Sequence, residues 1–206
     1  MIQMKAIFTA TLLALCNFVY AQQNTEFKEI KDYFDSQKSL LKTEFQKKYL
    51  AENNPLKKDK IKADYKDFVQ KIDSVKNVAY LGALIRVKNT EDLKKVVHHP
   101  EVKMDNQEVE KPEFPNGINS LREKVAELFY ADGICCDDKE LNTILKFVVE
   151  KDGSLSEISA DGEIPAFNKQ AEIALYLLSD KFQKPGTVNG NAVRYVFRMP
   201  IRMRLE

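Results

Sequence analysis

The C-terminal stretch from Val193 onward constrains the fold of this chain more than any other segment. Apolar and polar residues alternate there almost without interruption, which is the period of two that a half-buried β-strand requires. The apolar set shares one side and comprises Val193, Tyr195, Phe197, Met199, Ile201, Met203 and Leu205. The opposite side carries Arg194, Arg198, Arg202 and Arg204. We expect the aromatic side of this final strand to face a core and the arginine side to face solvent.

The segments before this strand predict a small α+β domain. Apolar residues at Ile118, Leu121, Val125 and Leu128 have helical spacing. Residues 142–160 alternate around Asp152 and Gly153, a turn pair between two strands. A second helix is predicted from residue 165 to about 181, and residues 184–192 form a loop before the last strand. The predicted order is helix, strand, strand, helix, strand, with an antiparallel sheet covered by helices on one face.

The N-terminal half is predicted to be helical. Two amphipathic stripes predict an antiparallel helical hairpin whose helices are separated at Asn53 to Pro55. The first stripe comprises Phe27, Ile30, Phe34, Leu41 and Phe45, and the second comprises Ile61, Tyr65, Phe68, Ile72 and Val75. Residues 78–87 are apolar throughout and fit either a buried strand or a helix. A short helix capped by Thr90 should follow. We therefore divide the chain into a helical region at 22–99, a polar linker at 100–111 and a second domain at 112–206.

Residues 1–21 have the pattern of a secretory signal peptide. Lys5 precedes an apolar run that ends in small residues at Val19 and Ala21, so cleavage is expected after Ala21. The mature protein would then be periplasmic. The alternative is an uncleaved segment that anchors the protein in the inner membrane, although the apolar run is shorter than the roughly 20 residues that a spanning helix needs.

Charge and composition exclude some classes of function. The formal net charge is +1 with both signs interspersed, which gives no electrostatic case for nucleic-acid binding. No nucleophile motif is present, so we predict that the protein is not an enzyme and uses no cofactor. His98 and His99 are adjacent at the end of a predicted helix, where interaction with the helix dipole is a simpler interpretation than metal binding.

Cys135 and Cys136 are neighbours in the chain and would be the only cysteines of the mature protein. Free thiols, a strained ring between the two, and bridges to another chain are all open interpretations. A redox-responsive or metal-responsive protein is therefore one alternative function. The spacing lacks the gap of familiar zinc knuckles, so no metal site is predicted.

Taken in order, several of these segments resemble the C-terminal domain of TonB in the form found in many Bacteroidetes proteins. The resemblance covers about residues 112–206 and depends on "PEFPNG", "FVVEKDGSLSEI", "FNKQAEIAL" and "FQKPGTVNGNAVRYVFRMPIRMRL". The matching motif residues are Pro115, Gly117, Asp152, Gly153, Pro185, Gly186, Asn189, Gly190, Val193 and Pro200, the last within the final strand. The chain departs from the family at Phe182, where tryptophan is common, and at Ala131, where proline is common.

The resemblance implies a periplasmic module that binds a partner, such as a segment of an outer-membrane transporter, by adding a strand at a sheet edge. The residues that would select the partner are Arg194, Arg198, Pro200, Arg202 and Arg204. Proline suits an edge strand because it cannot donate a ladder hydrogen bond. The same edge would also allow two copies to pair as a homodimer. Three alternatives remain open: arginines that are simply solvated, arginines that guard the edge against aggregation, and a membrane-anchored TonB-type energy transducer.

Overall fold

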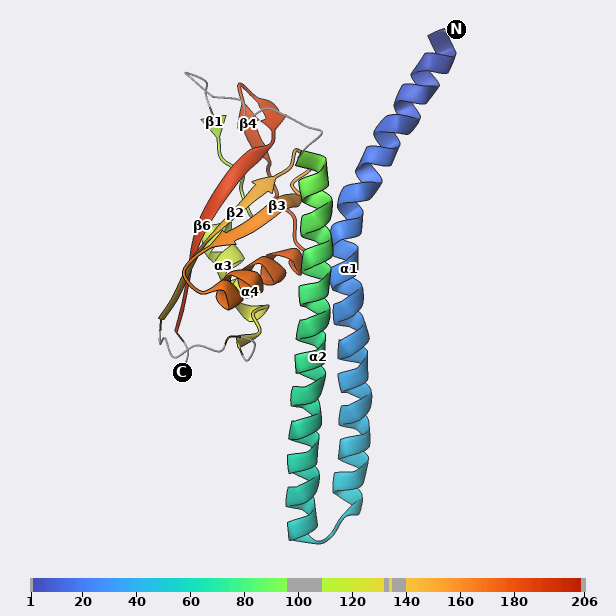
Figure 1. The fold of residues 1–206 in the computed structure, drawn as a ribbon, viewed down its shortest axis with the longest axis vertical. Helices are drawn as coiled ribbons and strands as arrows, with labels where there is room; N and C mark the ends of the chain where they lie inside the picture. Colours follow the sequence, from blue (N-terminus) through green and yellow to red (C-terminus); the bar gives the residue numbers. More distant parts are fainter. Residues whose placement is uncertain (1, 96–108, 132–133, 135–139, 205–206) are drawn as a thin grey trace. The chain divides into compact units, whose positions relative to one another are not determined.

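A computed structural model describes residues 2–95, 109–131, 134 and 140–204, with side chains from residue 25 onward except those of 94 and 95. Within this described part the chain contains four α-helices and two small antiparallel sheets of three strands each (Figure 1). The helices are α1 (Ile2–Ala51), α2 (Pro55–Lys95), α3 (Gly117–Glu127) and α4 (Pro165–Tyr176). The strands are β1 (Val109–Glu110), β2 (Glu140–Val149), β3 (Leu155–Asp161), β4 (Gly186–Val188), β5 (Asn191–Val193) and β6 (Tyr195–Arg204). The mixed α+β class with a helical N-terminal region is thereby confirmed.

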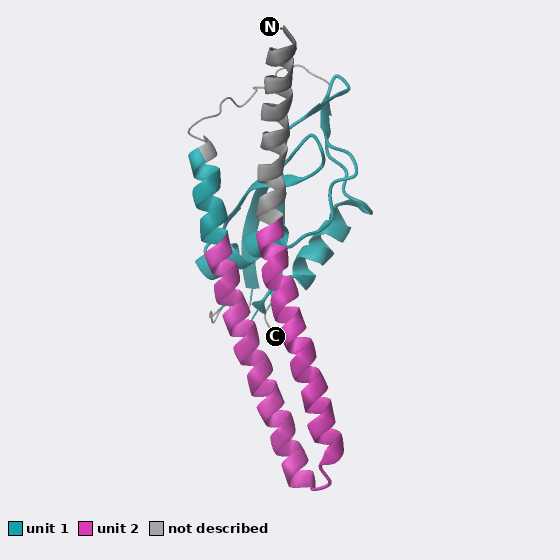
Figure 2. Ribbon diagram, turned by 90° about the vertical axis from the view of Figure 1, so that its right-hand side faces the viewer, with its two compact units in different colours: residues 1–24, 84–206 teal, residues 25–83 magenta. Residues whose placement is uncertain are grey.

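The chain forms two compact units, whose boundaries lie inside α1 and inside α2 (Figure 2). One unit is residues 25–83, the helical hairpin. The other contains residues 84–206 together with residues 1–24. The last turns of α2 therefore belong to the same unit as the sheets. Most of the predicted linker at 100–111 lies outside the described residues, and its end forms the short strand β1.

The hairpin unit is built from the two amphipathic stripes. Phe45 stacks on Tyr65 with ring centroids 4.3 Å apart, and Phe27 stacks on Tyr80 at 6.0 Å, so the two helices are antiparallel. Asn54 caps α2, because its side-chain oxygen accepts a hydrogen bond from the Leu56 N–H. The predicted stripe is only partly correct, since two of its residues on α2, Phe68 and Val75, are more than half exposed.

Helix α2 is continuous through two segments whose structure the sequence left open or misassigned. Residues 78–87 are helical, which settles the choice between strand and helix. The prediction of a separate helix starting at Thr90 is wrong, because α2 continues to Lys95. The Thr90 hydroxyl donates to the Arg86 carbonyl one turn earlier instead of capping a helix.

Helix α1 begins at Ile2 and includes the segment predicted to be a signal peptide. Among the residues that the structure describes, no helix combines the length and the apolar composition that crossing a membrane requires. The signal peptide at 1–21 and the periplasmic location stay predictions.

The larger sheet has the order β3-β2-β6 and is antiparallel throughout. One face is buried and the other largely exposed, since the residues of β2 alternate in burial up to Phe147, after which Val148 and Val149 are both buried. Helix α4 packs against β3 and β2, and α3 packs against α4. On β6, Met199 and Ile201 are buried as expected, whereas Tyr195 and Phe197 are only half-buried.

A second sheet was not predicted. Residues 184–192 were expected to be a loop, but β4 and β5 form a hairpin in this segment and β1 pairs with β4. Asn189 and Gly190 connect the two strands, with φ angles of 50° and 77°. Two consecutive positive φ angles are what a tight two-residue hairpin turn needs, and Asn-Gly is the preferred pair.

Candidate functional site

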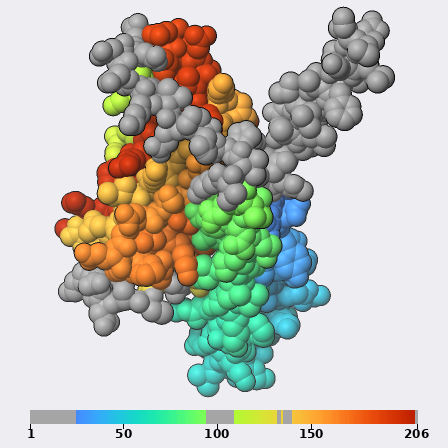
Figure 3. Space-filling view, turned by 45° about the horizontal axis from the view of Figure 1, so that its top comes forward, coloured from blue at the N-terminus to red at the C-terminus, as the bar shows by residue number. Residues whose placement is uncertain are grey.

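Strand β6 is an edge strand in the described part of the chain. It pairs with β2 over ten residue pairs without a register shift, from Glu140 opposite Arg204 to Val149 opposite Tyr195. The sheet order places no described strand on its other side. Red atoms of the C-terminal segment lie at the molecular surface in the space-filling view (Figure 3). We define the β6 edge as Val196, Arg198, Pro200, Arg202 and Arg204, which are all exposed.

The exposed face beside this edge is basic with an apolar centre. Arg198 lies opposite Lys146 of β2, so two cations are neighbours. Ile144 is 51% exposed and lies opposite Pro200, and Val196 is 48% exposed. Arg202 forms one loose ion pair, 3.6 Å from the Glu140 carboxylate.

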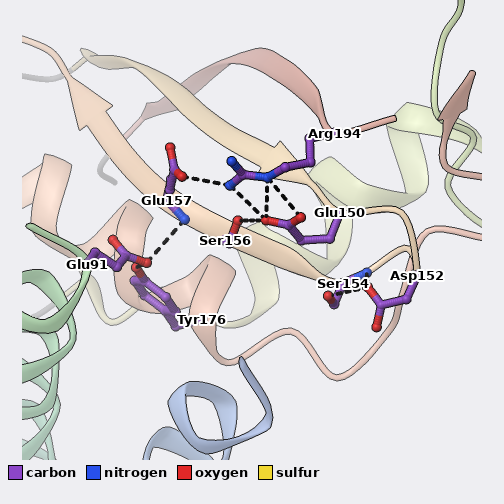
Figure 4. A network of polar contacts seen from close by, with 8 residues as sticks. All are labelled: Glu91, Glu150, Asp152, Ser154, Ser156, Glu157, Tyr176 and Arg194. Atoms are coloured by element: carbon purple, nitrogen blue, oxygen red, sulfur yellow. Dashed lines mark hydrogen bonds and ion pairs between the residues drawn. The ribbon is translucent and has the colours of Figure 1, made fainter. Parts of the chain in front are cut away.

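Arg194 differs from the other predicted arginines because carboxylates of the same chain hold it. Its guanidinium forms hydrogen bonds of 2.9–3.1 Å to Glu150 and one of 2.7 Å to Glu157 (Figure 4). Ser156 also donates to the Glu150 carboxylate. Partial burial alone would lower the pKa of Arg194, but the hydrogen bonds from this side chain to Glu150 and Glu157 outweigh burial and raise its pKa. Arg194 thus fastens the start of β6 to β2 and β3.

Glu91 near the end of α2 extends this network into the helix. Its carboxylate is 5% exposed and accepts hydrogen bonds from the Tyr176 hydroxyl at 2.9 Å and from the Glu157 N–H at 3.1 Å (Figure 4). Glu157 has a φ of 50° and lies at a β-bulge where the register between β2 and β3 shifts. Burial and the neighbouring Glu91 charge raise the pKa of Tyr176, so its hydroxyl remains a donor.

Sequence reasoning missed Glu91. The expected helix capped by Thr90 would put Glu91 in its first turn, whereas the carboxylate lies inside α2 and contacts Tyr176 of α4 and Glu157 of β3. Lys88, one turn earlier, approaches Glu172 at 3.4 Å and donates to the Ile158 carbonyl. A helix continuing through residues 78–95 would have placed both side chains on one side, three residues apart.

The Asp152–Gly153 turn and Phe182 are packed together. Gly153 has a φ of 79°, and a Cβ atom there would lie 2.3 Å from the Phe182 carbonyl oxygen, so only glycine fits. Burial of Asp152 opposes ionisation, but hydrogen bonds from Ser154 and Lys181 outweigh it and lower the pKa of Asp152 to about 2. Asp152 and Gly153 therefore hold the turn against the segment that leads to β4.

Phe182 is buried in an aromatic cluster. Its ring centroid lies 5.3 Å from that of Phe114, 6.1 Å from Phe147 and 5.9 Å from Phe197. Next to this cluster is a shallow groove of about 390 Å³, lined in part by Phe114, Ile118, Phe182 and Phe197. Phenylalanine thus takes a core position between the segment that leads into α3 and the strands β2 and β6.

The remaining motif residues lie in turns and short strands. Pro115 lies within a turn in which the N–H of Gly117, the first residue of α3, donates to the Phe114 carbonyl. Gly186 in β4 lies against Tyr195, and a Cβ atom there would be 2.7 Å from the Tyr195 Cβ. Pro185 directly precedes β4, while Val193 is the last residue of β5.

The two cysteines and two histidines singled out in the sequence, Cys135, Cys136, His98 and His99, lie outside the described part of the chain. Within the described ranges no group of three or more His, Cys, Asp or Glu side chains could hold a metal ion.

Comparison with known proteins adds no relative: no family model matches the chain, and no curated protein or solved structure matches it. The resemblance to the TonB C-terminal domain therefore remains a prediction from the motifs, and the geometry of the β6 edge is the basis for a functional proposal.

Proposed function

We propose that this chain is a non-enzymatic protein-binding module, similar to the TonB C-terminal domain, that takes up an extended partner segment as an added strand along the β6 edge. The observation that carries the proposal is a ten-residue strand paired on one side only in the described structure. Main-chain groups on an open edge supply affinity in this mode of binding, and alternating side chains supply selectivity. In this proposal the protein is periplasmic, and the added strand comes from a protein of the outer membrane.

Pro200 indicates which residues of β6 present their main chain outward. In an antiparallel ladder, residues alternate between bonding to the neighbouring strand and facing away from it. Proline has no N–H and is tolerated in an edge strand where that group would face outward. We infer that Val196, Arg198, Arg202 and Arg204, which share the parity of Pro200, direct their N–H and C=O groups toward an incoming strand.

The side chains beside this edge favour a partner with acidic and apolar residues. Arg198, Arg204 and Lys146 are exposed cations on the same face, and no ion pair in the described residues joins them to a carboxylate. Exposed Ile144 lies opposite the proline, and exposed Val196 lies four residues before it on the same face of β6. Charge complementarity of this kind steers association and selects partners more than it adds affinity.

Capture of envelope proteins by the immobilised protein, combined with hydrogen exchange, tests this proposal. Two edge variants are informative: Val196→Pro removes an outward N–H, and Arg198→Glu reverses one charge. Lys151→Glu is the matched control, since Lys151 is an exposed cation in the turn between β2 and β3 and does not belong to the basic face beside the edge. We expect both edge variants to lose the captured partner, the control to retain most of it, and the partner to protect alternate amides of β6 from exchange.

Two outcomes would contradict strand addition at β6. The first is equal capture by the wild-type protein and the Val196→Pro variant, with circular dichroism showing that both are folded. The second is partner binding that leaves the exchange of β6 amides unchanged and protects another segment.

A further inference from the structure

The helical hairpin contains an incomplete core. Of residues 28–79, not one is fully buried. The apolar side chains that meet between α1 and α2, such as Phe34, Leu41 and Ile72, remain half-buried. Helices in water depend on packing of an apolar face rather than on intrinsic propensity. The contact surface between α1 and α2 remains partly exposed to solvent, so further apolar packing against it would stabilise the hairpin.

The two sides of the hairpin have opposite character. On one side, two ion pairs join the helices: Lys38 to Asp73 at 2.7 Å and Lys76 to Asp35 at 2.8 Å. These charges are only partly exposed and fix the relative register of α1 and α2. Charged side chains that are already paired suit the solvent side of a bundle.

The other side is apolar and has a groove. At 100° per residue, Tyr33 lies about 160° from Asp35 around α1, so it projects on the side away from the ion pairs. A shallow groove of about 380 Å³ opens there between the helices and is lined by Tyr33, Phe34, Gln37, Leu40, Leu41, Glu44 and Ile72. On α2, Phe68 and Val75 flank Ile72 on the same side. Four of these side chains are 54–61% exposed: Tyr33, Leu40, Phe68 and Val75.

We propose that this apolar side, defined by Tyr33, Leu40, Phe68 and Val75, binds the same side of a second copy of the chain, so that two hairpins form an antiparallel four-helix bundle. The area of the face supports a hairpin as the occupant. Helices of 27–29 residues are about 40 Å long, and a pair is about 20 Å wide, so the face measures about 800 Å². This matches the area that each partner buries in a stable interface, whereas a single helix would cover about half of it.

The spacing of the apolar residues favours a copy of the same chain. Tyr33 and Leu40 are seven residues apart on α1, and Phe68 and Val75 are seven residues apart on α2. A two-fold axis that passes through the groove, perpendicular to the helices, would place the apolar residues of one copy opposite those of the other. Because the spacing is seven residues on both helices, the two sets would interdigitate as knobs-into-holes packing requires. The burial of the four side chains would complete the core around Phe34, Leu41 and Ile72. This proposal is independent of the proposed function of β6.

Sedimentation equilibrium of the full chain tests the proposal. The wild-type protein should have twice the chain mass of 23.7 kDa at about 100 μM. The double variant Leu40→Asp, Phe68→Asp should raise the dimer Kd by about 100-fold or more, because it places four charges in a desolvated interface. The matched control is Leu50→Asp, Leu56→Asp, which alters two leucines that are 78% and 81% exposed near the hairpin turn. The control should leave Kd within about threefold of the wild-type value.

Gln37→Leu keeps the test decisive if the double aspartate variant loses helicity by circular dichroism. Gln37 is half-buried in the groove, so leucine there should lower Kd by about fivefold to tenfold. A monomeric wild-type protein would overturn the proposal, as would an unchanged Kd for Gln37→Leu. A dimer that survives Leu40→Asp, Phe68→Asp but dissociates in Val196→Pro would place the contact at the β6 edge and would equally overturn it.

Discussion

Replacement of Glu91 tests whether the end of α2 is part of the sheet-containing unit. Glu91→Ala removes the acceptor of two hydrogen bonds, from the Tyr176 hydroxyl at 2.9 Å and from the Glu157 N–H at 3.1 Å. Both Glu91 and Tyr176 are at most 5% exposed, so water does not readily replace the lost acceptor. Each unsatisfied buried donor costs about 1–3 kcal/mol, and we expect a total loss of about 3–5 kcal/mol.

Two further variants separate hydrogen bonding from packing. Glu91→Gln retains a side-chain oxygen that can accept both bonds, so it should cost only about 1 kcal/mol. In a double-mutant cycle, Glu91→Ala and Tyr176→Phe should show a coupling of about 1–2 kcal/mol. Guanidinium unfolding followed at 222 nm gives the free energies, and hydrogen exchange of the Glu157 amide reports the local bond.

Glu91→Ala should therefore lower the free energy of unfolding more than Glu91→Gln does. Equal losses of unfolding free energy in Glu91→Ala and Glu91→Gln would contradict this, because they would show that the hydrogen-bond acceptor does not determine the stability at this position. A loss below about 1 kcal/mol for Glu91→Ala, with unchanged exchange at Glu157, would show that the end of α2 contributes little to the unit. The bulge at Glu157 would then have to be held by the Arg194 network alone.

Three further predictions concern the core and the turn of the sheet. Phe147→Ala should lower the free energy of unfolding by about 3–5 kcal/mol because the ring is fully buried, whereas Phe197→Ala, half-buried, should cost about 1–2.5 kcal/mol by the same denaturation assay. Gly153→Ala should cost more than about 2 kcal/mol, since a Cβ atom would lie 2.3 Å from a carbonyl oxygen at a φ of 79°; a melting temperature equal to that of the wild-type protein would refute the clash. Asp152 has its pKa lowered from 3.8 to about 2, so its ionised form stabilises the fold above about pH 4 and this contribution is lost as the pH falls toward 2. Asp152→Asn should therefore cost about 0.5–1 kcal/mol at pH 7, a value reduced by exposure to solvent, and the difference from wild type should disappear in melts near pH 2.

The sequence predicted the elements whose pattern is local. The alternation of β6 and the helical stripes follow from periods that each segment carries by itself. Asp152 and Gly153 marked the β2–β3 turn because glycine there accommodates a positive φ. The β4–β5 hairpin was missed although Asn189 and Gly190 are the usual turn pair, because each of its strands has only three residues and shows no alternation.

The contacts that distinguish one arginine from another could not be predicted from the alternation. Arg194 and Arg198 belong to the same polar side of the sequence pattern, yet only Arg194 meets Glu150 and Glu157 in the structure. Glu150 follows the end of β2 and Glu157 lies at the bulge in β3, and both carboxylates reach Arg194, whereas Arg198 lies opposite Lys146. Register shifts depend on how two strands pair, and this is a property of the tertiary structure.

The three interpretations of the β6 arginines can now be separated by charge. An edge guarded against aggregation needs a charge of either sign together with Pro200, because repulsion and the missing N–H discourage unwanted pairing. A merely solvated face needs only polarity. Recognition of an acidic segment needs positive charge at particular positions, so Arg198→Glu preserves protection and polarity but removes recognition. Loss of the partner by a variant that remains soluble and folded would therefore support recognition over both alternatives, and unchanged capture would leave Arg198 as part of a guarded or solvated edge.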